Sequence, residues 1–99
     1  MSELADLWKI QQNAPFPASC LPLSIDGVRL VKLDAAAGAI LTAVLRRDGV
    51  VRPPDDAKRR DLERQRGLIL QALRDVALDG EGKAYFERLA ALADAVLKK

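Results

Sequence analysis

Few side chains in this sequence could do chemistry, and the most suggestive group lies in DVALDGEGKAYFE at 75–87, which has the outline of a calcium loop. With Asp75 at position 1, Asp79 falls at position 5 and Gly80 at position 6, where such loops need glycine. Position 3 is an alanine, however, and position 12, which must supply a bidentate carboxylate, is Phe86. Read as a phosphate cradle, the segment lacks the spacing and the Ser or Thr of a Walker loop. We interpret it as a turn before a helix and predict no metal site and no cofactor.

Catalysis at neutral pH often relies on histidine, and the chain contains none. This excludes Ser-His-Asp triads, Cys-His pairs and imidazole metal ligands. Cys20 is the only cysteine and has no base near it in the sequence, so we predict a packed or idle thiol. An enzyme would have to use carboxylates, Arg59 or Tyr85. We therefore predict no catalytic residue and a protein that is not an enzyme.

The segment RPPDDAKRRDLERQR at 52–66 holds six basic and four acidic side chains. At 100° per residue on a helix, its basic side chains point in well-separated directions, whereas a duplex-binding helix gathers them on the side that meets the phosphates. Acidic residues also precede basic ones at supportive helical spacings (Asp55–Arg59, Asp56–Arg60, Asp61–Arg64 and Glu63–Arg66). We interpret the segment as the solvated start of a helix. Protein docking or nucleic-acid contact through the outward-pointing Arg60 and Arg64 is the alternative.

The composition bounds the size and the class of the protein. Ninety-nine residues, 49% of them hydrophobic, suit one packed domain over 1–99, and a net charge of +2 is too small to indicate an acidic partner. A lone cysteine excludes an intramolecular disulfide and favours a reducing compartment. The start MSELADLW lacks the pattern of a signal peptide, and the apolar run at 35–45 is about half the length that spans a bilayer. We expect a soluble cytoplasmic protein with no membrane contact.

The first third of the chain predicts a helix, an arm and a hairpin. In the N-terminal unit, 1–21, Ser2 can cap a helix over 3–12, and the proline-rich stretch that follows is a connector. We predict that Trp8 and Phe16 anchor this arm on the core, with contact to a partner as the alternative. In 22–33, the Asp-Gly pair at 26–27 between alternating apolar residues predicts a β-hairpin with strands 22–26 and 28–32.

The unit 34–49 is read as a central helix, with Asp34 as its N-cap and Gly49 as its terminator. Its circumference is apolar almost all round, with Thr42 as the polar break on one face, so we expect burial on all sides, either inside the domain or at an oligomer interface. Gly38 in the middle of a helix costs about 1 kcal/mol relative to alanine. A tight crossing with another helix, in the same or another chain, is our preferred explanation.

The unit 53–98 predicts two long helices. The first runs over 54–78 with Pro54 in its first turn, and Asp79-Gly80 ends it before a last helix over 83–97. The short connection implies an antiparallel helical hairpin. The predicted fold is therefore mostly α (α+β), with four helices, including this long hairpin, and one small β-hairpin.

These features favour a small non-enzymatic protein–protein interaction module, either a homodimer or an accessory subunit of a larger assembly. The alternative is a nucleic-acid-associated or regulatory protein that uses the arginine-rich start of helix 54–78, although nucleic acid is not the partner we expect. The expected partner is a protein, and the candidate interface residues are Trp8, Phe16, Gly38, Thr42, Arg60 and Arg64.

Overall fold

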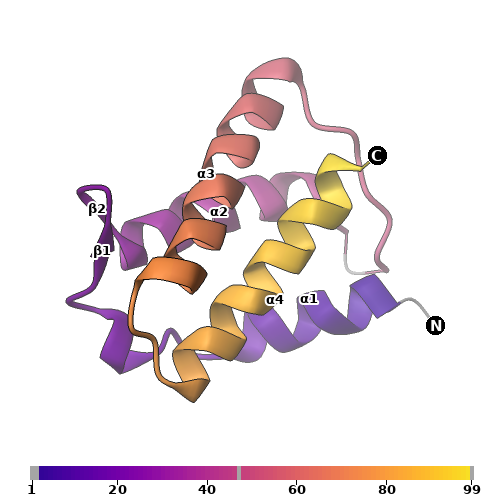
Figure 1. Cartoon of the computed structure of the whole chain (residues 1–99). Helices are drawn as coiled ribbons and strands as arrows, with labels where there is room; N and C mark the ends of the chain where they lie inside the picture. Colours follow the sequence, from indigo (N-terminus) through magenta and orange to yellow (C-terminus); the bar gives the residue numbers. More distant parts are fainter. Residues whose placement is uncertain (1–2, 47, 99) are drawn as a thin grey trace.

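The computed structural model describes residues 3–46 and 48–98, so the Ser2 cap lies outside the described residues. The elements along the chain are α1 (Glu3–Asn13), the short 3-10 helix η1 (Ala18–Cys20), β1 (Ser24–Ile25), β2 (Val28–Arg29), α2 (Leu30–Val44), α3 (Asp56–Asp75) and α4 (Gly80–Leu97). Figure 1 shows their arrangement, with α3 and α4 as neighbours and α1 and α2 on either side of α4. With 71% of the described residues helical, the predicted mostly-α fold of four helices and one β-hairpin is confirmed.

Two aspartates set the starts of the hairpin helices α3 and α4. The Asp55 carboxylate accepts from the Lys58 N–H at 2.8 Å, and the Asp79 carboxylate accepts from the Gly82 N–H at 2.7 Å. Each satisfies one of the free N–H groups of a first helical turn. Our boundaries were therefore wrong in detail. Pro54 precedes the cap of α3 and is buried rather than lying in the first turn, and α4 begins at Gly80 rather than at 83.

The β-hairpin is shorter than expected. Its register pairs Ser24 with Arg29 and Ile25 with Val28, and the turn residues Asp26 and Gly27 have φ values of 50° and 78°, the signs that a type I′ turn requires. The predicted second strand over 28–32 is wrong, because the helix α2 already begins at Leu30. In a helix Leu30 and Leu33 share one face, and both are buried, which a strand ending at 32 would not achieve.

The predicted cap and terminator of the central helix are also wrong. Asp34 lies inside α2, whose N-cap position is occupied by Arg29 without a side-chain cap. At the other end α2 stops at Val44, and Gly49, with a φ of 85°, serves a turn within the loop that follows. That loop closes because Leu45 forms an antiparallel bridge with Val51 and is itself buried.

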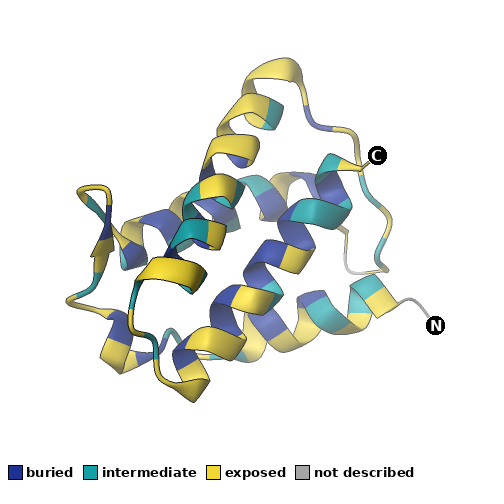
Figure 2. Cartoon of the chain, in the orientation of Figure 1, coloured by how far each residue is buried: buried dark blue, intermediate teal, exposed yellow. Residues whose placement is uncertain are grey.

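Only one side of α2 is buried, so the expectation that the domain surrounds this helix is wrong. Its inward residues are Leu30, Leu33, Ala37, Leu41 and Val44. Its exposed residues include Ala35, Ala36, Ala39, Thr42 and Ala43, and Figure 2 shows the resulting change of colour along the helix. These alanines made the sequence look apolar all round, but a methyl group gains little from burial compared with the larger side chains on the inner face.

The core lies where α4 meets α1, α2 and α3. The N-terminal arm joins it through Phe16, whose ring packs edge-on against Tyr85 and Phe86 with centroid distances of 5.6 and 6.0 Å. Trp8 is 5% exposed and belongs to the same core. Both aromatic residues therefore hold the arm to the core, as predicted. Among the helices of the described residues, none is both long and apolar enough to span a bilayer.

Candidate functional site

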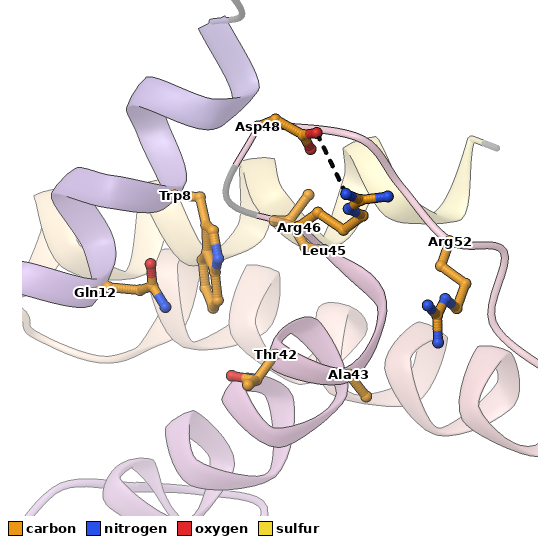
Figure 3. Close-up of a pocket in the computed structure, with 8 residues that line it drawn as sticks. All are labelled: Trp8, Gln12, Thr42, Ala43, Leu45, Arg46, Asp48 and Arg52. Carbon is orange, nitrogen blue, oxygen red and sulfur yellow. Dashed lines mark ion pairs between the residues drawn. The ribbon is translucent and has the colours of Figure 1, made fainter.

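A groove runs between α1 and α2, which both pack on α4. Near the start of α2 it is a hollow of about 250 Å³, with Tyr85 and Leu89 of α4 among its lining residues. Near the end of α2 it widens into a hollow of about 620 Å³, drawn in Figure 3. The two hollows share Trp8, Gln12 and Thr42, so we treat them as one feature, the α1–α2 groove.

Gly38 and Thr42 form a small-residue wall of the groove. A Cβ atom added at Gly38 would meet nothing within 4 Å, so no other part of the described chain approaches it closely. The Thr42 hydroxyl donates to the Gly38 carbonyl at 2.7 Å, one turn back on the same helix. A tight helix crossing within the described residues is therefore excluded as the reason for this glycine. A crossing with another chain stays a prediction.

The wide end of the groove is formed by the loop 45–52, of which residues 45–46 and 48–52 are described. Backbone bonds close the loop, from Arg46 N–H to the Val50 carbonyl at 3.0 Å and from Arg52 N–H to the Val44 carbonyl at 2.6 Å. In this short ladder Arg46 and Arg52 are diagonal neighbours, which places them on one side, and both line the groove. The loop therefore holds two guanidinium groups on the side that lines the groove.

Among the described residues that line the wide end of the groove, one carboxylate, that of Asp48, accompanies these two arginines. One of its oxygens accepts from the Val50 N–H at 3.0 Å, and the other lies 3.8 Å from the Arg46 guanidinium. Both side chains of this pair are more than half exposed, so the pair contributes little. Figure 3 shows Arg46 directed toward Asp48 and the Arg52 guanidinium directed away from both. This end of the groove therefore carries a net positive charge.

At the narrow end, the floor of the groove is held by hydrogen bonds between three helices. The Tyr85 hydroxyl donates to Asp34 at 2.9 Å, the Gln11 amide donates to the Tyr85 carbonyl at 3.4 Å, and Arg88 donates to the Gln11 side-chain oxygen at 2.9 Å. Burial, reinforced by the bond to Asp34, raises the pKa of Tyr85. Burial also raises the pKa of Asp34, and the bond from Tyr85 partly offsets this. Tyr85 therefore stays protonated at neutral pH and acts as a donor that ties α4 to α2.

The arginine-rich start of α3 lies apart from the groove, and Figure 1 shows these first turns projecting beyond the other helices. Arg60 and Arg64 are exposed; Arg64 pairs with Asp61 at 3.4 Å, as predicted, and Arg60 bonds to the Asp56 carbonyl. Other members of the run bond outside the expected pairs: Arg66 pairs with Asp94 of α4, Arg59 donates to the Leu97 carbonyl, and Lys58 pairs with Asp55. Much of this charge is therefore engaged within the protein.

The structure thus separates the predicted interface residues into three groups. Trp8, Gly38 and Thr42 come together in the α1–α2 groove, Phe16 packs in the core, and Arg60 and Arg64 lie on α3. Sequence reasoning missed the loop arginines Arg46 and Arg52. Asp48-Gly49, which follows two arginines and precedes two valines, is the same dipeptide turn signal that identified the β-hairpin, and it could have revealed the loop.

The segment considered as a calcium loop has a structural use. The Asp79 carboxylate caps α4, and Gly82 packs so closely on Cys20 that a Cβ atom there would lie 2.7 Å from the Cys20 Sγ. Burial raises the pKa of the Cys20 thiol. Within 3–46 and 48–98 no group of three or more His, Cys, Asp or Glu side chains is placed to hold a metal ion. Comparison with known proteins adds no function, since no family model, curated protein or solved structure matches the chain.

Proposed function

We propose that this chain is a small non-enzymatic protein–protein interaction module, working as a homodimer or as an accessory subunit, and that its partner contacts the α1–α2 groove. The observation that carries the proposal is Gly38. It stands in the middle of α2 with open space around its missing side chain, at a position where alanine would favour the helix by about 1 kcal/mol. Nothing in the fold of the single described chain requires a glycine there, whereas a closely approaching partner would.

The surroundings of Gly38 support the same function. Ala35, Ala39 and Thr42 are exposed on this side of α2, and small side chains allow a second helix to approach to about 8 Å between axes, the short end of the usual range. The neighbouring Trp8 is an aromatic residue fixed in the core with one side lining the groove. A rigid wall of this kind can receive a partner without a large loss of side-chain entropy.

The absence of an enzymatic role is proposed from the way the titratable groups near the groove are used. Tyr85 cannot act as a general base at neutral pH, because its raised pKa keeps it protonated and its hydroxyl already donates to Asp34. Arg88 is engaged by Gln11 and lies 5.9 Å from the centroid of the Tyr85 ring. These groups position helices. No observation favours the nucleic-acid alternative, which therefore becomes one outcome of the test below.

The test compares two leucine variants at helix-interior glycines. Gly38→Leu fills the groove wall, and Gly67→Leu makes the same change in the middle of α3, where a Cβ atom likewise meets nothing within 4 Å. Both variants should fold at least as stably as the wild type. Association, measured as mass in solution and as capture of a defined protein from native lysate, should be lost in Gly38→Leu alone.

Two results would contradict the proposal. If both variants associate like the wild type, the groove is not the partner surface. If the protein instead elutes with nucleic acid that is released by salt, the arginine-rich start of α3 becomes the better candidate.

A further inference from the structure

We infer that the partner in the α1–α2 groove is a second copy of this chain, related by a two-fold axis that runs along the groove. In this arrangement α1 of each copy lies over α2 of the other, and the acidic first turn of α1 meets the loop 45–52 of the partner copy. The inference rests on the proposed function and adds to it the identity of the partner and the geometry of the contact.

The first step is the relative direction of the two helices. Near the narrow end, Gln11 and Ala14 of α1 line the groove together with Asp34 and Ala35 of α2. Near the wide end, Trp8 lines it together with the loop 45–52. The helices α1 and α2 are therefore antiparallel, so the first turn of α1 lies at the same end of the groove as the loop arginines.

The second step is charge. Glu3 and Asp6 are exposed in the first turn of α1, and neither takes part in an ion pair among the described residues. At the same end, within the described part of the chain, the loop offers Arg52 without an ion pair and Arg46 with only its long contact to Asp48. The two guanidinium groups point in different directions, which suits two separate carboxylates better than one small anion. Glu3 and Asp6, three residues apart on a helix, supply two carboxylates as neighbours on its surface.

The third step is the choice between two possible two-fold arrangements. An axis across the groove would pack α2 antiparallel on its own copy. Arg46 of the other copy would then approach the exposed Lys32 at the start of α2 and the nearby Asp34, whose carboxylate already accepts from Tyr85. An axis along the groove instead places the start of α1, with the two carboxylates of Glu3 and Asp6 against the single ammonium group of Lys9, over the loop of the partner copy, and symmetry forms this contact twice. Opposite charges therefore select the second arrangement.

The expected strength follows from the size of the face. The 15 residues of α2 span about 22 Å, and two helices side by side are about 20 Å wide, so the face projects roughly 400 Å² per copy. A standard interface buries about 800 Å² per partner. The dimer should therefore be weak and salt-sensitive, with dissociation in the micromolar range.

The test is charge reversal with rescue, followed by sedimentation equilibrium. The loop variant Arg46→Glu/Arg52→Glu places acid against acid, and the helix variant Glu3→Lys/Asp6→Lys places base against base. Each variant alone should self-associate at least about tenfold more weakly than the wild type. An equimolar mixture should restore association, because both contacts between the unlike copies again join opposite charges.

Arg60→Glu/Arg64→Glu is the matched control, with the same number of charges reversed on α3, and it should associate like the wild type. Circular dichroism confirms that each variant is folded. If the wild type stays monomeric at high micromolar concentration, the partner is not a second copy. The proposed function is then tested separately, by whether another protein is captured by the wild type and not by Gly38→Leu. If association of the wild type depends on Gly38 but not on charge, the proposed function stands and the arrangement of the two copies is wrong. The arrangement is also wrong if the equimolar mixture fails to associate.

Discussion

Replacing Gly82 with alanine is expected to destabilise the protein, although alanine favours helices over glycine. The added Cβ atom would lie 2.7 Å from the Cys20 Sγ and 3.1 Å from the Asp79 Oδ1. Neither atom can easily move, because Cys20 is fully buried and the Asp79 Oδ1 holds the capping bond at 2.7 Å. Overpacking costs about 1–3 kcal/mol, and the gain in helix propensity of up to about 1 kcal/mol offsets only part of it. We expect a net loss of about 1–2 kcal/mol.

The assay is urea unfolding followed by circular dichroism, with a double-mutant cycle. Gly67→Ala is the control, since its Cβ atom meets nothing, and it should gain several tenths of a kcal/mol. Cys20→Ala removes the sulfur atom that blocks the new methyl group, so Gly82→Ala should cost at least about 1 kcal/mol less in that background. If Gly82→Ala is as stable as Gly67→Ala, or if the coupling is zero, η1 does not pack on the first turn of α4 as described.

Gln65→Leu should raise the free energy of unfolding by about 1 kcal/mol, because the buried Gln65 Oε1 has no hydrogen-bond partner among the described residues; a loss of stability in urea would mean that this oxygen is satisfied. Reversing Arg60 and Arg64 to glutamate should change stability by less than about 0.5 kcal/mol, and a folded variant that loses its partner would move the working surface to α3. Hydrogen bonds from backbone N–H groups lower the pKa values of Asp55 and Asp79 in the folded protein. The two carboxylates therefore stabilise the fold fully above the ordinary pKa of 3.8, and this stabilisation is lost as the pH falls through their lower pKa values in the folded state. Asp79→Asn keeps an N-cap but cannot titrate, so its melting temperature should fall less on acidification than that of the wild type. If the two proteins show the same decrease in acid, the pKa of Asp79 is not lowered.

The helices could be predicted from the sequence because local signals and burial agree over most of their length. The Asp79-Gly80 pair separates the two long helices that the sequence predicts, and the structure contains both of them. At the start of α2 the local sequence signals and the burial of apolar side chains favour different structures. The Asp-Gly turn and the apolar residues that follow it favour a strand to residue 32, yet burial of Leu30 and Leu33 on one helical face prevails. That preference is tertiary, since it depends on helices that are distant in the sequence.

The groove was less accessible to sequence reasoning. Trp8, Gly38 and Thr42 were chosen for separate reasons, and only the packing of α1 and α2 on α4 brings them to one place. The loop arginines were missed because Asp48-Gly49 was read as a helix end, and the short ladder between Leu45 and Val51 has no strong strand pattern. The openness around Gly38 follows from the absence of a neighbour in three dimensions, which no local pattern encodes.

Methyl NMR of the associating wild type tests the groove most directly, because exposed alanines lie both beside it and far from it. If the α1–α2 groove is the partner surface, the methyl resonances of Ala35, Ala39 and Thr42 should shift or broaden as association is driven by concentration or by added partner. The methyl groups of the exposed Ala57 on α3 and Ala91 on α4 should stay unchanged. Shifts confined to Ala57 or Ala91, with the α2 methyl groups unaffected, would contradict the groove as the interaction surface.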